Sequence, residues 1–83
     1  MKKIQILSDR NEDVVLVVEP FGDRYILTAG GAAHIYRSDG GELNIHNDLF
    51  EMTLFSSNSI GVWVKESVLV VDENGDPLSR EAV

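Results

Sequence analysis

One stretch decides how this chain folds: Val14-Val15-Leu16-Val17-Val18-Glu19-Pro20-Phe21-Gly22-Asp23-Arg24-Tyr25-Ile26-Leu27. Its two apolar runs are rich in β-branched and aromatic residues, which favour extended strands. Between the runs, Pro20 suits the start of a turn, and Gly22 can adopt the left-handed conformation that a three-residue hairpin loop needs. The stretch therefore predicts an antiparallel hairpin that pairs Val17 with Tyr25 and Val15 with Leu27.

The first run, residues 14–18, is apolar at every position. A strand with two apolar faces is either central in its sheet or an aggregation hazard. Glu12, Asp13, Glu19 and Pro20 flank it as gatekeepers. The sequence leaves both interpretations of the run open.

The rest of the chain repeats the same alternation of short apolar segments with clusters of Gly, Asn, Asp, Ser and Pro. No window shows the apolar stripe of an amphipathic helix. The pattern predicts an all-β, single-domain antiparallel β-sandwich or flattened barrel of seven to eight short strands within residues 1–77, followed by a flexible tail at 78–83. The expected strands cover residues 2–7, 14–19, 24–28, 33–37, 42–46, 51–56, 60–65 and 68–72.

Composition narrows the classes of function. The 83 residues include no Cys, so disulfides, thiolate metal sites and Cys nucleophiles are excluded. The formal net charge is −7, of which residues 42–83 contribute −6, and this disfavours binding to nucleic acid or to anionic membranes. Neither a membrane span nor a signal peptide is indicated, so we expect a cytoplasmic protein.

Turn chemistry predicts a meander in the second half of the chain. If Asp39-Gly40-Gly41 closes a hairpin with Gly41 left-handed, His34 lies opposite His46. Keeping the apolar faces together then places His46 opposite Glu51. A two-residue turn at Asp39-Gly40 is the alternative, but it mixes polar and apolar faces.

The predicted row of His34, His46 and Glu51 suggests one candidate site. Two imidazoles and a carboxylate are ligands that divalent metals accept. The alternative is a polar outer sheet face on which two histidines happen to be opposite each other.

The aromatic residues Tyr36, Phe55 and Trp63 would lie on the same outer face. Exposed aromatic side chains are enriched in protein interfaces and their hot spots. In the alternative interpretation, the first strands cover this face, or Trp63 merely shields the neighbouring Gly61.

Other motifs indicate no catalytic residue and no cofactor. The segment 72–76 resembles a calcium loop, but its Gly is fourth instead of sixth, so a turn that ends the last strand is expected. Neither a nucleophile elbow nor a phosphate-binding loop is present in the sequence. We therefore expect a protein that is not an enzyme.

Residues 18–27 and 40–45, within a region spanning about 14–72, resemble a pattern in small acidic bacterial proteins of unassigned function. Those proteins tend to read E-P-aromatic-G, then Tyr, a Gly turn and G-G-x-L-x-apolar. This chain has Thr28-Ala29 where the relatives often have Pro before the Gly turn. The resemblance implies a small β fold and supplies no activity.

Together these features predict a bacterial protein-interaction or accessory module. An inhibitor-like or immunity-like role toward a basic protein is the most concrete version, because opposite charges speed encounter. The alternatives are a small-ligand or divalent-metal-binding β-domain, and a structural homo-oligomer such as a homodimer.

Overall fold

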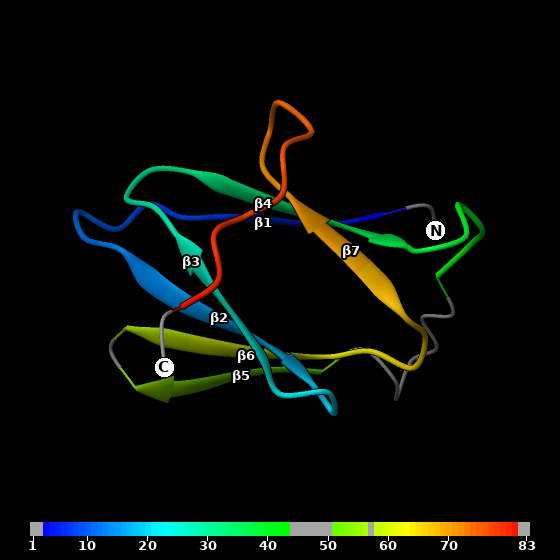
Figure 1. Ribbon diagram of the computed structural model, residues 1–83. Coiled ribbons are helices and arrows are strands. Elements are labelled where there is room, and N and C mark those ends of the chain that lie inside the picture. The colour runs from blue at the N-terminus through cyan, green and yellow to red at the C-terminus, as the bar shows by residue number, and fades with distance from the viewer. Residues whose placement is uncertain (1–2, 44–50, 57, 82–83) are drawn as a thin grey trace.

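The computed structural model describes residues 3–43, 51–56 and 58–81, and for residues 51–56 it describes the backbone only. Within this part of the chain every regular element is a strand, so the predicted all-β fold is confirmed (Figure 1). No helix in the described ranges is long and apolar enough to cross a membrane. The strands are β1 (Lys3–Leu7), β2 (Val14–Glu19), β3 (Asp23–Leu27), β4 (Ala32–Arg37), β5 (Glu51–Ser56), β6 (Ser59–Trp63) and β7 (Val68–Val71).

These strands agree with the predicted segments to within two residues at each end, with one exception. The strand predicted at 42–46 is not observed at Glu42 and Leu43, and its other residues lie outside the described part of the chain. Arg37 fixes the local path, because its Nη1 donates to the Glu42 carbonyl oxygen at 3.1 Å.

Two sheets make up the described fold, one in the order β1-β4-β7 and the other in the order β3-β2-β6-β5. β2 lies between β3 and β6, so the first of the two interpretations of this apolar run, a central strand, is the one observed. Leu16 and Val17 point to opposite sides of β2, and their exposed fractions are only 0% and 4%. Both faces of this strand are therefore covered.

The predicted β2–β3 hairpin forms, but its predicted register is wrong by one residue. Leu16, and not Val17, lies opposite Tyr25. The reason is a longer loop, which runs from Glu19 to Gly22 and is closed by the Gly22 N–H donating to the Val18 carbonyl oxygen at 2.9 Å. Gly22 has the expected left-handed conformation, with a φ of 76°.

The predicted meander of four consecutive strands is wrong, although its last hairpin, between residues 51–56 and 60–65, forms as the antiparallel pair of β5 and β6. β4 is bordered by β1 on one side and by β7 on the other, so it has no free edge for the next segment of chain. β5 instead joins the other sheet beside β6, and β6 runs parallel to β2. The Asp39 turn differs from the prediction as well, because Gly40, with a φ of 78°, takes the left-handed position expected for Gly41.

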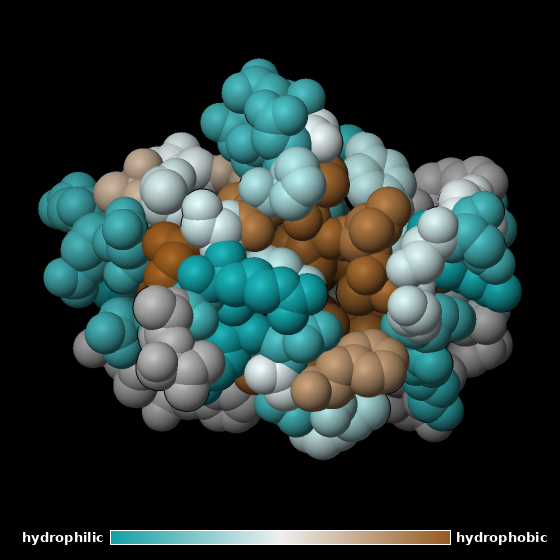
Figure 2. Space-filling model, viewed as in Figure 1, coloured by the Kyte–Doolittle hydropathy of each residue, from teal (hydrophilic) through white to brown (hydrophobic). Residues whose placement is uncertain are grey.

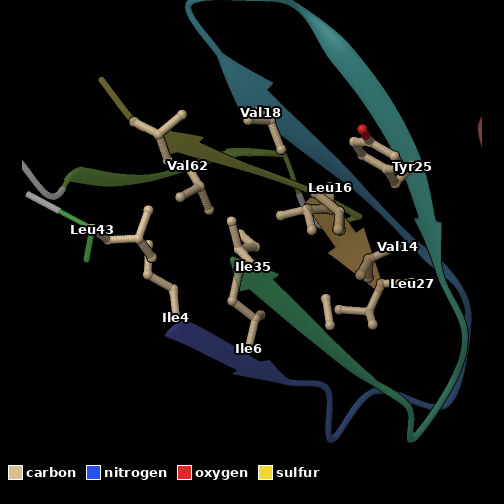
Figure 3. Close-up of a cluster of buried hydrophobic side chains, with 13 residues drawn as sticks. Ile4, Ile6, Val14, Leu16, Val18, Tyr25, Leu27, Ile35, Leu43 and Val62 are labelled. Carbon is tan, nitrogen blue, oxygen red and sulfur yellow. The ribbon is translucent and has the colours of Figure 1, made fainter. Parts of the chain in front are cut away.

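One hydrophobic core lies between the two sheets, and both of them contribute to it (Figure 3). Ile35 of β4, Leu16 of β2 and Val62 of β6 are completely buried. Burying each such side chain stabilises the fold by roughly 1.5–3 kcal/mol. The full cluster is Ile4, Ile6, Val14, Leu16, Val18, Tyr25, Leu27, Ala33, Ile35, Leu43, Val62, Val64 and Val70.

Residues 77–81, which we call the strap, connect the two sheets. The Leu78 N–H donates to the Val70 carbonyl oxygen of β7 at 3.2 Å, and the Ile26 N–H of β3 donates to the Ser79 carbonyl oxygen at 2.8 Å. The Leu78 side chain packs against the core. The predicted flexible tail is therefore wrong over 78–81, where backbone pairing and apolar packing hold the chain, and residues 82–83 lie outside the described ranges.

Candidate interaction surface

The structure does not contain the predicted row of His34, His46 and Glu51. His34 of β4 lies opposite Gln5 of β1 and Val71 of β7, so its predicted position opposite His46 is wrong. His46 lies outside the described residues, and Glu51 belongs to the other sheet. In the part of the chain that the structure describes, no group of three or more His, Asp and Glu side chains could hold a metal ion.

The predicted aromatic residues do not share one face. Tyr36 follows the core residue Ile35 in β4, and Trp63 follows the core residue Val62 in β6, so each points outward from a different sheet. They are exposed by 36% and 41%, which argues against a second buried layer. Phe55 lies in β5, for which the structure describes only the backbone.

Tyr36 instead belongs to the outer face of the three-stranded sheet. Along each of these strands the outward positions alternate with core positions such as Ile4, Ile35 and Val70. Leu7 and Leu69 on this face are exposed by 71% and 54%. The face consists of Lys3, Gln5 and Leu7 from β1, Ala32, His34 and Tyr36 from β4, and Leu69 and Val71 from β7.

Cross-strand register orders this outer face into three rows. Tyr36 lies between Lys3 and Leu69, His34 lies between Gln5 and Val71, and Ala32 lies opposite Leu7. A carboxylate occurs in none of the three rows, although the whole chain carries 14 Asp and Glu residues. The result is a sheet surface with exposed apolar carbon, a lysine and polar hydrogen-bonding groups.

His34 is the central side chain of this face. Its Nε2 atom is buried and, among the described residues, has no hydrogen-bond partner. Leaving a buried polar atom without a partner costs about 1–3 kcal/mol. The sequence indicated that His34 points outward, but not that its neighbours across the strands are Gln5 and Val71.

Acidic groups stand at one end of the outer face. β1 and β7 run in the same direction on either side of β4, so the segments that follow them leave the sheet at the same end. Asp9 follows β1, and the turn at 72–76 follows β7. Figure 1 shows this turn projecting at the top of the molecule, and Figure 2 shows it as a hydrophilic protrusion.

The carboxylate of Asp72 is engaged within this turn. It accepts hydrogen bonds from the Asn74 and Asp76 N–H groups at 2.8 and 3.0 Å. Gly75 has a φ of 87°, as a tight turn at this position requires. The prediction of a turn that ends the last strand is confirmed.

A second cluster of charges lies where the strap meets β3. Arg80 Nη1 is 3.1 Å from Asp23 Oδ1, and Arg24 pairs with Glu81. Burial raises the pKa of Tyr25 above its ordinary value of 10.0, with Arg80 opposing and Asp23 reinforcing the shift. Both arginines already have carboxylate partners. The cluster therefore attaches the strap to β3 and is not an anion site.

Three cavities that described residues line are small. They lie between β3 and the strap, beside the Asp39 turn and beside Gly22, and have volumes of about 220 to 240 Å³. Pockets for small ligands typically measure about 300–1,000 Å³. These cavities do not favour the small-ligand alternative.

In comparisons with protein-family models, curated proteins and solved structures, no match to this chain was found. The resemblance to small acidic bacterial proteins therefore stays a prediction.

Proposed function

We propose that this chain is a non-enzymatic protein-interaction module that binds its partner through the outer face of the β1-β4-β7 sheet. The observation that carries the proposal is the exposure of Leu7, Tyr36 and Leu69 on one sheet surface. Apolar and aromatic side chains gathered on a rigid surface are typical of binding sites, whereas single exposed ones need no explanation.

The scaffold supports this use of the face. We infer that the two sheets pack as a β-sandwich, since one core cluster receives side chains from both of them. The two sides of β4 then have different functions: Ile35 packs in the core, and Tyr36 contacts the partner. A sheet whose inner side is fixed in this way presents its outer side with little conformational entropy to lose.

The acidic groups beside the face suggest what the partner carries. Glu73 and Asp76 are exposed in the turn that follows β7, and the chain has a net charge of −7. A partner with a basic segment at the edge of its contact surface would be steered toward the face, and the interaction would weaken as salt screens the charges. This is the inhibitor-like or immunity-like version of the proposal.

A capture experiment with matched variants tests the proposed face. The immobilised protein is exposed to an extract of its source organism, and retained proteins are compared with those retained by Leu69→Lys and by the control Phe21→Lys. Leu69 and Phe21 are exposed by 54% and 51%, but Phe21 lies in the β2–β3 loop. We expect the control to retain the same proteins and Leu69→Lys to lose them, and equal retention by the two variants would contradict the proposal.

A further inference from the structure

We propose that the cavity between β3 and the strap holds the side chain of a lysine or arginine that the partner carries. This inference rests on the proposed function and deepens it, because it names the chemical group that anchors the partner beside the outer face. Three observations carry it: the mixed apolar and acidic lining of the cavity, the lack of a cation paired with its carboxylates among the described residues, and its size.

The cavity lies at the end of the outer face where β7 leaves the sheet. Val71, the last residue of β7, lies opposite His34, so Asp72 follows beside the start of β4. Ala32, the first residue of β4, lines the cavity. Figure 1 shows the strap descending from the turn beside β3, and these two segments supply further walls. The cavity is therefore next to the surface that the proposed partner covers.

The lining combines apolar walls with acidic groups. Ile26, Pro77 and Leu78 contribute apolar carbon, and Asp72 and Glu73 contribute carboxylates. Long basic side chains bury their aliphatic stems along apolar surface while the charged group stays among polar ones. This lining therefore fits a cation on an aliphatic stem better than it fits an anion or an uncharged polar group.

In the described part of the chain, neither carboxylate of this cavity has a cation as its partner. Asp72 Oδ1 accepts the two backbone hydrogen bonds of the turn, and no described residue bonds Asp72 Oδ2 or the Glu73 carboxylate. The three ion pairs formed by described residues involve other acids. A cleft lined by charges of one sign concentrates groups of the opposite charge. The cavity therefore attracts a cation from outside the chain.

The other two cavities differ in this respect. Beside the Asp39 turn, Arg37 pairs with Asp39. Beside Gly22, Arg24 pairs with Glu81. In both places an arginine of this chain already supplies the positive charge. Of the three cavities, the one beside the strap is therefore the one that suits a basic side chain of a partner.

The volume of the cavity, about 240 Å³, fits one side chain. A cavity of about 150 Å³ is large enough to bind benzene, whereas pockets for small ligands usually measure about 300 Å³ or more. A lysine or arginine side chain lies between these sizes. Because such a side chain loses much rotamer freedom when it is fixed, we expect it to bind weakly in isolation, with a dissociation constant of about 1–20 mM.

Nuclear magnetic resonance titration of the isotope-labelled full chain with Nα-acetyl-lysine methylamide, up to about 50 mM at constant ionic strength, tests the proposal. We expect saturable shifts of the amide signals of Ile26, Ala32 and Ser79, which line the cavity. The arginine derivative shows which of the two cations is preferred. The norleucine derivative keeps the stem without the charge and should bind at least about fivefold more weakly. The absence of saturable shifts with both basic derivatives, or equal binding of norleucine, would overturn the inference.

Matched variants separate the cavity from a general attraction to an acidic chain. Asp72→Asn removes a charge but keeps an oxygen for the turn, and Glu73→Gln removes the other charge, so each should weaken binding at least about threefold. Glu12→Gln is the control, because Glu12 is exposed and does not line the cavity, and it should change binding less than about 1.5-fold. Equal binding by these three variants would overturn the inference.

Ser79→Leu tests the cavity itself. The larger side chain occupies the space while both carboxylates remain, so binding of the lysine derivative should weaken at least about fivefold. Unchanged binding would mean that the acids attract the probe without a cavity for its stem, which would contradict the proposal. Circular dichroism confirms that each variant is folded before it is compared.

The outcomes also separate this inference from the proposed function. If neither basic derivative binds, but the captured proteins are lost in Leu69→Lys, the outer face is still a binding surface and only the anchoring side chain is wrong. If the lysine derivative binds in the cavity, but capture is unaffected by Leu69→Lys, the cavity holds a basic side chain and the proposed outer face is wrong.

Discussion

The guanidinium group of Arg80 lies over the ring of Tyr25, with its Cζ atom 5.1 Å from the ring centroid. The same guanidinium pairs with Asp23 at 3.1 Å. Through these contacts Arg80 of the strap binds β3 in the four-stranded sheet. The Leu78 N–H of the strap is paired with the Val70 carbonyl oxygen in the other sheet. The strap therefore stabilises the association of the two sheets.

Arg80→Ala should lower the free energy of unfolding by about 0.5–1.5 kcal/mol, since it removes an exposed ion pair and a cation–π contact. Urea denaturation followed by tryptophan fluorescence measures the change. Lys65→Ala, a substitution of an exposed cation outside the strap, is the matched control and should change the free energy by less than about 0.5 kcal/mol.

Leu78→Ala tests the apolar half of the strap. Leu78 is partly buried against the core, so we expect a loss of about 1–2 kcal/mol, less than for a completely buried leucine. Leu7→Ala, at a side chain that is 71% exposed, should cost less than about 0.5 kcal/mol. Equal losses in the two variants would mean that the strap does not depend on this contact.

Stability should decrease at high pH because of Tyr25. Burial raises the pKa of its phenol above 10.0, so the unfolded chain ionises first as the pH rises. The contribution of Tyr25 to stability is therefore fully present below pH 10 and is lost as the pH rises through the pKa of the folded state. Melting temperatures between pH 8 and 11 measure this loss, which should be smaller in Tyr25→Phe and unchanged in the control Tyr36→Phe.

Gly22→Ala should lower the free energy of unfolding by about 1 kcal/mol. The φ of Gly22 is 76°, and a Cβ atom built there meets nothing within 4 Å, so the cost comes from the backbone and not from a collision. Asparagine tolerates the left-handed conformation better, and Gly22→Asn should therefore cost less. A larger loss in Gly22→Asn than in Gly22→Ala would contradict this explanation.

His34→Val should raise the free energy of unfolding by about 1 kcal/mol. It removes a buried nitrogen that has no partner among the described residues, and it places a β-branched side chain in the central strand of the sheet. Thermal denaturation at pH 7.5 measures the change. A loss of stability would show that the Nε2 atom makes a favourable contact after all.

The sequence predicted the strands well and their partners poorly. Alternation and turn residues identify β3, β6 and β7 because these signals are local. The parallel pairing of Leu16 with Ile60 joins residues that no turn connects, so turn chemistry could not predict it. The strap was missed because its residues, apart from Leu78, have no strand-like alternation.

The prediction of the candidate site failed for the same reason, because it depended on which strands are neighbours. Outward pointing of His34 and Tyr36 was predicted correctly, because alternation along one strand decides it. Their neighbours were not, because β4 pairs with β1 and β7 and not with the segment that follows it. Because of this single error in strand order, the prediction placed Trp63 and Glu51 in the same sheet as His34. In the structure they lie in the other sheet.

The parallel pairing of β2 with β6 has a consequence for the timing of folding. About 40 residues separate the two strands, so β2 gains its second neighbour only after a long loop has closed. At synthesis rates of about 5–20 residues per second, this leaves β2 with an open edge for several seconds on the ribosome. During that interval Glu12 and Asp13, beside the apolar run, discourage contact between nascent chains.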